Sequence, residues 1–409
     1  MSKPRVAIVS FPGNNCEVES IRAIKNAGME PVFHKWNDDL ANLGDIGGYF
    51  LPGGFSYEDR GRAGMISARD PIMDFIREEA AKGKVVIGNC NGAQVLVESG
   101  LIPNAEGLEM SLAQNAVQGE AVGFLSEWIW VTAECDRDRC ATSDWEGVMH
   151  MPIAHGEGRF TTKDRALWKA LIDNDQMAFS YCDEAGNAAP TIEFNPNGSE
   201  LATAGICNPE GNVVALMPHP ERTLNGDPYF ASMKKWIESH PAREEGSVSQ
   251  RDTSETVSFT KRESTGLEIF IDTKIVNNEE RTVEQAASRL FPNIVLKQMK
   301  YFSIPGGDAE QVLGSISLFN SNKEIAYIRR GDDYFRWEPD DKKEVPIDSV
   351  INNTSLLRRN EPDTGSVGLK EGSETGVCYV CLGVSDNELT QKAVTEIFGN
   401  PHSSTLELL

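Results

Sequence analysis

The sequence predicts an α/β fold, in which a doubly wound parallel sheet is followed by a smaller C-terminal α+β domain. Two features carry this prediction. Short apolar runs alternate with amphipathic helical patterns near the N-terminus, an order typical of parallel strands with helices on both faces of the sheet. After residue 240 the chain becomes polar and rich in serine, which is typical of a linker between domains.

The first domain is predicted over residues 1–240. Its expected strands lie at residues 6–11, 31–36, 48–51, around 85, 128–132, 177–181 and 213–217, and its expected helices at 16–26, 70–81, from 93 and at 229–238. The pattern over 70–81 places Ile72, Phe75 and Ile76 on one face, as in an amphipathic helix. In such sheets the functional site lies beyond the carboxyl ends of the strands, so residues that directly follow a strand are the candidates.

The second domain is predicted over residues 266–409, after a linker over residues 241–265. Its expected strands lie at residues 267–275, 294–304, 377–384 and 404–408, and its expected helices at 283–290 and 388–398. Residues 306–375 are polar and acidic with isolated apolar patches, and we interpret them as an insertion within this domain.

The composition is that of an ordinary globular protein, with 40% hydrophobic and 25% charged residues. The formal net charge of −23 disfavours nucleic acids and anionic membranes as partners, because both bind basic surfaces. No apolar run has the length of a membrane-spanning helix, and no signal-peptide core follows Met1, so the cytoplasm is the expected compartment.

Eight cysteines in 409 residues do not make a disulfide framework. Cys135, Cys140, Cys378 and Cys381 could together supply four zinc ligands. However, Cys378 and Cys381 lie in a predicted strand with their side chains on opposite faces, which favours plain thiols over a zinc or redox site. We therefore expect no metal site in this chain.

The most informative motif is Gly88-Asn89-Cys90-Asn91-Gly92, which joins a predicted strand to a predicted helix. A reactive residue between glycines at such a turn has the layout of a nucleophile elbow, where bulkier neighbours would clash. The helix N-terminus favours the thiolate, because unpaired N–H groups and the helix dipole stabilise negative charge. Cys90 is therefore the candidate nucleophile of an acyl-transfer enzyme.

A second motif, Pro218-His219-Pro220-Glu221-Arg222, directly follows the predicted strand at 213–217. A histidine and a carboxylate two residues apart can form a relay. His219 would take the thiol proton and later protonate the leaving group, while Glu221 would orient the imidazole.

Glycines also follow the predicted strand at 48–51. Gly53 and Gly54 leave backbone N–H groups open to a ligand, so this segment could supply one donor of an oxyanion hole. The N–H of Asn91, which follows the nucleophile, would be the other donor.

The Cys90 and His219 motifs resemble those of class I glutamine amidotransferases, whose sheet is flavodoxin-like. Further stretches resemble the glutaminase component of phosphoribosylformylglycinamidine synthase, and they lie at residues 11–16, 53–59, 62–64, 155–160, 197–199 and 217–222. Departures from that pattern are Glu58, where glycine is expected, Gly61, where a large residue is expected, and Ala93, where an aromatic residue is usual.

The resemblance implies that Cys90 attacks the side-chain amide of glutamine and that the ammonia passes to a large synthetase subunit. That partner would use ATP and Mg²⁺ to aminate formylglycinamide ribonucleotide in purine biosynthesis, and this chain would need no cofactor of its own. Gln94 would bind glutamine. His155 would line the glutamine site, face the synthetase or serve the fold alone.

The C-terminal domain resembles the small third subunit of the same synthase in its order of strands and helices. The residues that carry this weaker similarity lie at 282–287, 296–301 and 398–401, although Met299 replaces the glycine of a glycine-lysine pair. Such a domain would bridge to the synthetase and would also allow self-association. Two other interpretations of the chain stay open at this point: a cysteine hydrolase of another class and a non-catalytic assembly subunit.

Overall fold

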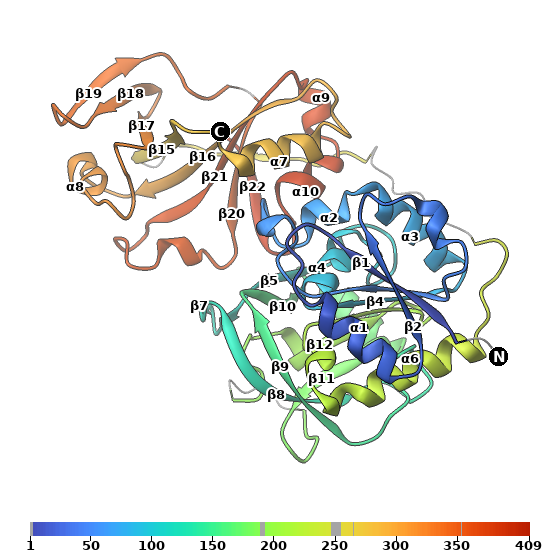
Figure 1. Cartoon of the computed structure of the whole chain (residues 1–409). Helices are drawn as coiled ribbons and strands as arrows, with labels where there is room; N and C mark the ends of the chain where they lie inside the picture. The colour runs from blue at the N-terminus through green and yellow to red at the C-terminus, as the bar shows by residue number, and fades with distance from the viewer. Residues whose placement is uncertain (1–2, 189–192, 247–254, 265, 353) are drawn as a thin grey trace. The chain divides into compact units, whose positions relative to one another are not determined.

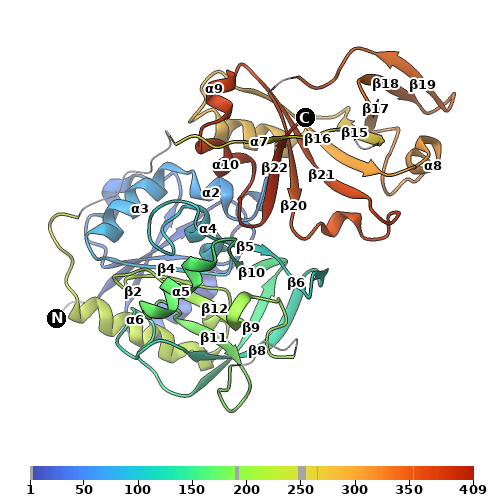
Figure 2. The same cartoon turned by 180° about the vertical axis from the view of Figure 1, so that it is seen from behind.

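The computed structural model describes residues 3–188, 193–246, 255–264, 266–352 and 354–409. The chain divides into two compact units, Met1–Arg251 and Asp252–Leu409, each of which has its own sheet (Figures 1 and 2). Within the described residues, no helix is long and apolar enough to cross a membrane.

The first unit is built on a nine-stranded sheet with the order β2-β1-β3-β4-β13-β12-β11-β8-β9. The first five strands in this order are parallel: β1 (Arg5–Ser10), β2 (Glu30–Lys35), β3 (Gly48–Leu51), β4 (Val85–Asn89) and β13 (Val213–Leu216). Antiparallel strands extend the sheet: β12 (Thr203–Cys207), β11 (Phe179–Cys182), β8 (Leu125–Ala133) and β9 (Val148–His155). The parallel part has the flavodoxin-like order, which confirms the predicted fold class.

Helices cover both faces of this sheet (Figure 1). One face carries α1 (Glu17–Asn26) and α6 (Asp227–Ser239), and the other carries α2 (Met65–Ala68), α3 (Pro71–Ala81), α4 (Asn91–Glu98) and α5 (Arg165–Asp173). The strands supply both cores because alternate side chains point to opposite faces: Ala7 and Val9 pack with α3 and α4, and Val6 and Ile8 pack with α1 and α6.

Short elements complete the first unit. Two small antiparallel sheets pair β5 (Ser111–Gln114) with β10 (Glu157–Thr161) and β6 (Ala116–Val117) with β7 (Glu120–Ala121). Single turns of 3₁₀-helix are η1 (Leu40–Leu43), η2 (Ser56–Asp59), η3 (Glu200–Ala202), η4 (Pro220–Arg222) and η5 (Leu224–Gly226). Of these, η2 follows β3 and η4 follows β13, so both lie at the carboxyl edge of the parallel strands.

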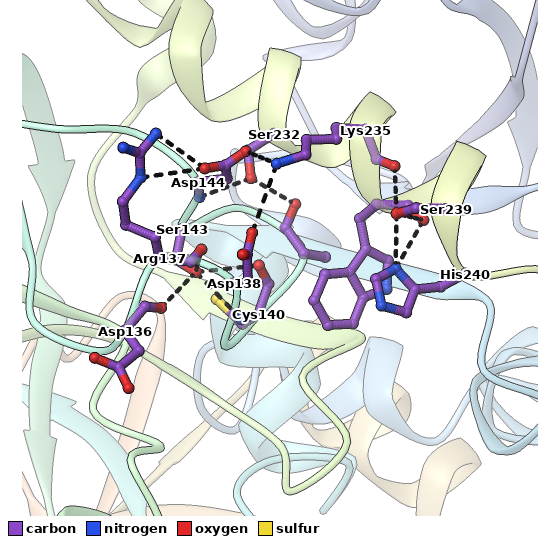
Figure 3. A network of polar contacts seen from close by, with 12 residues as sticks. Asp136, Arg137, Asp138, Cys140, Ser143, Asp144, Ser232, Lys235, Ser239 and His240 are labelled. Atoms are coloured by element: carbon purple, nitrogen blue, oxygen red, sulfur yellow. Dashed lines mark hydrogen bonds and ion pairs between the residues drawn. The ribbon is translucent and has the colours of Figure 1, made fainter.

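A polar network fastens the long connection between β8 and β9 to α6 (Figure 3). Lys235 of α6 pairs with Asp144, and its Nζ lies 3.6 Å from Asp138 Oδ1. The Asp144 backbone N–H donates to Ser232 Oγ at 3.0 Å, and Arg137 Nη2 lies 3.0 Å from Asp144 Oδ1. The network therefore connects the β8–β9 segment to α6, the helix that begins just after the His219 motif.

The second unit contains another nine-stranded sheet, with the order β14-β22-β20-β21-β16-β15-β17-β18-β19. Its strands are β14 (Thr260–Lys261), β15 (Leu267–Thr273), β16 (Val295–Ile304), β17 (Glu324–Arg330), β18 (Asp333–Glu338), β19 (Lys343–Ile347), β20 (Ser355–Asn360), β21 (Glu374–Leu382) and β22 (Ser404–Leu408). Its helices are α7 (Asn278–Ala287), α8 (Ala309–Leu313), α9 (Asp386–Leu389), α10 (Ala393–Phe398) and the 3₁₀ turn η6 (Thr364–Ser366). This mixed architecture agrees with the expected α+β class.

Three details of the second unit differ from the sequence-based expectations. Residues 306–375 supply four strands, and β20 pairs on both sides within the sheet. Part of the predicted linker, β14, pairs with β22, while residues 247–254 of that linker lie outside the described residues. The single helix predicted at 388–398 is wrong: the helix is broken at residues 390–392, where Lys392 N donates to Glu255 O and Val257 N to Thr390 O.

Candidate active site

Cys90 lies between β4 and α4 in a strained backbone conformation, with φ 51° and ψ −109°. Its backbone N–H donates to Leu216 O of β13 at 2.8 Å, which ties the turn to the neighbouring strand. Both flanking glycines are required by space: a Cβ at Gly88 would lie 2.4 Å from Gly92 O, and one at Gly92 would lie 2.0 Å from Leu51 O. The turn therefore has the geometry of a nucleophile elbow.

His219 and Glu221 form a buried pair beside this turn. His219 Nδ1 lies 2.6 Å from Glu221 Oε1, and the two residues are 1% and 2% exposed. Burial lowers the pKa of His219, but the charges of Cys90 and Glu221 and the contact with the Cys16 thiol raise it above the ordinary value. Burial likewise raises the pKa of Glu221, and the His219 charge and hydrogen bond bring it below the ordinary value.

The structure adds two residues to this pair that the sequence analysis missed. Cys16 Sγ lies 4.0 Å from His219 Nδ1, and Arg222 Nη2 donates to Cys16 Sγ at 3.0 Å. Both belong to stretches that carry the family resemblance, and Arg222 also stands at the end of the His219 motif. Donor atoms of Cys16, His219 and Glu221 lie within 4.8 Å of one another and could hold a metal ion, although the Arg222 guanidinium already places a cation there.

The glycine segment after β3 packs directly against the relay. A Cβ at Gly53 would lie 2.7 Å from His219 Cε1, and Gly54 has a φ of +143°. The side chain of Asn91 connects this segment to α4, because its Oδ1 accepts from the Ser56 N–H at 3.2 Å. The N–H of Asn91 is at the first position of α4, where it has no partner within the helix.

Gln94 and two acidic residues, Asp59 and Glu157, lie next to the start of α4. Asn91 Nδ2 donates to Gln94 Oε1 at 2.9 Å, and Gln94 Nε2 donates to the backbone oxygen of Glu157. Burial and the Glu157 charge raise the pKa of Asp59 to about 7.

Glu58 has a φ of 58°. Glycine adopts this conformation most readily, which accounts for the glycine expected at this position.

His155, at the end of β9, is a buried neutral ring. It is 2% exposed, and its Nδ1 lies 3.2 Å from Asn115 Oδ1. Burial and, to a smaller extent, the His219 charge lower the pKa of His155 to about 3, which places the two histidines in electrostatic range. The ring packs on Gly158, where a Cβ would lie 2.2 Å from His155 Cε1.

The cysteines considered as zinc ligands belong to different units. All eight cysteines are buried and free. Cys135 and Cys140 contact each other in the first unit, whereas Cys378 and Cys381 are both on β21 in the second. Of the residues that the structure describes, none of these four belongs to a group placed to hold a metal ion.

Comparison with known families identifies the first unit. Residues 3–250 match the model of the CobB/CobQ-like glutamine amidotransferase domain. The chain belongs to this glutamine amidotransferase family. The Cys90 turn and the His219–Glu221 pair both lie within the matched residues, so the amidotransferase domain contains the whole site described above.

Three curated relatives match between 54% and 58% of this chain. "Phosphoribosylformylglycinamidine synthase subunit PurQ" of Methanothrix thermoacetophila is 41% identical over 257 residues, which span 57% of this chain and 98% of the relative. The proteins of the same name from Pyrococcus furiosus and Thermomicrobium roseum are 39% and 40% identical, over 99% and 88% of their lengths.

Among solved structures, "Structure of PurLQS from Thermotoga maritima" contains a similar chain. It is 31% identical, covers 58% of this chain and 100% of its own, and has a TM-score of 0.47. The crystal structure of a glutamine amidotransferase from Thermotoga maritima covers 59% of this chain and 83% of its own, with 18% identity and a TM-score of 0.32.

Proposed function

We propose that Cys90, His219 and Glu221 catalyse the hydrolysis of glutamine to glutamate and ammonia. One observation carries this proposal: Glu221 holds Nδ1 of the His219 ring, while the buried Nε2 has no hydrogen-bond partner of normal geometry among the described residues. That nitrogen is the one left to exchange a proton with Cys90, whose charge raises the pKa of His219.

The proposed reaction begins when the Cys90 thiol gives its proton to His219 and its sulfur attacks the side-chain amide carbon of glutamine. His219 gives its proton to the amide nitrogen, the carbon–nitrogen bond breaks, and ammonia leaves a thioester on Cys90. Water then attacks the thioester carbon and gives its proton to His219. The carbon–sulfur bond breaks, glutamate leaves, and the Cys90 sulfur takes the proton from His219. The N–H groups of the Gly53–Gly54 segment and of Asn91 would stabilise the oxyanion, and Gln94 would hold the substrate.

The names of the relatives indicate where this ammonia goes. We propose that the chain supplies it to the synthetase subunit of phosphoribosylformylglycinamidine synthase, in purine biosynthesis in the cytoplasm. ATP and Mg²⁺ would bind to that partner, because no Walker-type glycine loop is present in this sequence. The second unit would serve as the small third subunit of the synthase, which its order of elements resembles.

Glutamate release by the purified chain tests the proposal, with and without the synthetase subunit. Cys90→Ala should lower the rate by at least about 1,000-fold, since it removes the nucleophile. Cys378→Ala, a buried cysteine of the second unit, is the matched control and should keep the rate of the unsubstituted chain.

Two outcomes would contradict parts of this proposal separately. Activity that survives in Cys90→Ala would exclude the mechanism. Glutamate release without transfer of nitrogen to formylglycinamide ribonucleotide, with the synthetase present, would exclude the pathway and leave the chemistry intact.

A further inference from the structure

A buried chain of hydrogen bonds continues from the His219–Glu221 pair into the core of the first unit. Asn89 Nδ2 donates to Glu221 Oε2 at 3.2 Å, and Tyr229 Oη donates to Asn89 Oδ1 at 3.1 Å. Both Asn89 and Tyr229 are 0% exposed. Neither residue takes part in the mechanism proposed above.

We propose that Asn89 and Tyr229 are positioning residues that fix the Glu221 carboxylate and thereby the His219 ring. This inference rests on the proposed glutaminase function. It extends the relay to five residues, in the order Tyr229, Asn89, Glu221, His219 and Cys90.

The direction of these hydrogen bonds is set by the chemistry of the groups. The Glu221 carboxylate only accepts, so Asn89 must turn its NH₂ group toward Glu221 and its carbonyl oxygen away. Burial raises the pKa of Tyr229 well above its usual range, so the phenol stays protonated and donates to that carbonyl oxygen. Tyr229 therefore holds the Asn89 amide in the orientation that Glu221 requires.

The side chain of Asn89 also joins two parts of the site. Asn89 is the last residue of β4 and directly precedes Cys90, whereas Glu221 is in η4 after β13. The hydrogen bond from Asn89 to Glu221 therefore fixes the distance between the nucleophile turn and the His219–Glu221 pair. Tyr229 comes from α6, which the network around Lys235 and Asp144 connects to the segment between β8 and β9 (Figure 3).

The other oxygen of Glu221 already accepts from His219, so the Asn89 donor satisfies the remaining one. A buried carboxylate oxygen without such a donor lowers the stability of the fold, and the carboxylate would be free to rotate away from His219. Loss of this alignment should lower the rate of proton transfer, and glutamine binding should remain because neither side chain belongs to the proposed glutamine-binding groups.

The test measures glutamate release by the full chain together with its synthetase subunit. Asn89→Ala should lower kcat about 10-fold, and Tyr229→Phe about 3-fold, with KM nearly unchanged, which is the effect of losing one hydrogen bond to a charged or a neutral group. The double variant should be no slower than Asn89→Ala alone, because both changes interrupt one chain. Tyr49→Phe, which removes a buried hydroxyl bonded to Glu79 at 2.9 Å, is the matched control and should leave kcat unchanged.

A further variant separates positioning from a general loss of structure. Asn89→Asp keeps the shape of the side chain but places an acceptor against Glu221 unless it is protonated, so its activity optimum should move to lower pH. Independent effects of Asn89→Ala and Tyr229→Phe that multiply in the double variant, or an unchanged optimum in Asn89→Asp, would overturn the proposal. Absence of glutamate release by the unsubstituted complex would instead count against the proposed function itself.

Discussion

His155 shows at the scale of one residue how burial sets a protonation state near the relay. The ring is 2% exposed and packs against Gly158, so a charge on it would be poorly solvated. It stands close enough to His219 for the charge of that residue to lower its pKa. We therefore expect His155 to stay neutral while His219 carries and releases a proton.

This protonation state should be measurable as a dependence of stability on pH. The pKa of His155 falls from 6.5 to about 3 on folding, so between these values the unfolded chain binds a proton that the folded chain does not. The free energy of unfolding should therefore decrease as the pH falls through this range, by up to about 1.4 kcal/mol per pH unit from this residue. Urea unfolding of His155→Gln at several pH values should show a shallower decrease, and parallel curves for the two proteins would contradict the assignment.

At the scale of elements, the close packing of α4 against β3 constrains the position of Cys90. These elements approach so closely at Gly92 that its Cα lies against the Leu51 backbone. This contact also places the N-terminus of α4, and with it Cys90, at the carboxyl edge of the sheet. The glycine after the nucleophile therefore serves helix–strand packing as much as the turn itself.

Gly92→Ala should push α4 away from β3, because the added Cβ would lie 2.0 Å from Leu51 O. We expect the free energy of unfolding to fall by about 2 to 3 kcal/mol and glutamate release to be lost. Gly44→Ala is the matched control, since its φ is −62° and its Cβ would meet only Ala41 O at 3.7 Å. Equal stabilities of the two variants in chemical denaturation would show that the close approach is not a constraint.

The whole molecule consists of two units with separate cores. In the second unit, a charge cluster around the buried Arg262 joins β15, β16, β21 and β22 to the end of β14. Arg262 Nε donates to Tyr301 Oη at 3.0 Å, and its guanidinium pairs with Glu268, Glu374 and Glu407. Arg262 follows β14, so this cluster also holds the segment that enters the second unit.

Arg262→Met should destabilise the second unit, by about 3 kcal/mol, because the buried Glu268 loses one of its two arginine partners and keeps Arg329, whereas Glu374 and Glu407 still pair with Arg359. Hydrogen exchange measured on the full chain should become faster in β15, β16 and β21 and stay unchanged in β1 and β4. Arg336→Met removes an exposed pair, with Arg336 Nε 3.3 Å from Glu338 Oε1, and should cost at most about 1 kcal/mol. Faster exchange in both units would contradict their independence.

The sequence predicted most of the first unit because its signals are local. Apolar runs that are buried on both faces, such as residues 85–87, mark parallel strands, and the periodic pattern over 70–81 marks α3. The break between α9 and α10 was missed because it depends on pairing with residues 255–257, which are more than a hundred positions away.

For the site, the sequence by itself determined the candidate nucleophile and its relay. Cys90 lies between two glycines, and His219 and Glu221 are two positions apart. The nucleophile and the relay are therefore each contained in a short motif. Asn89 and Arg222 belong to the same two motifs, but only the tertiary structure showed that their side chains, with those of Cys16 and Tyr229, support the relay. Asn89 and Tyr229 are 140 positions apart, and their contact exists because β4, η4 and α6 pack against one another. Side chains that meet only through such packing leave no local pattern, which is why the chemistry could be predicted and its support could not.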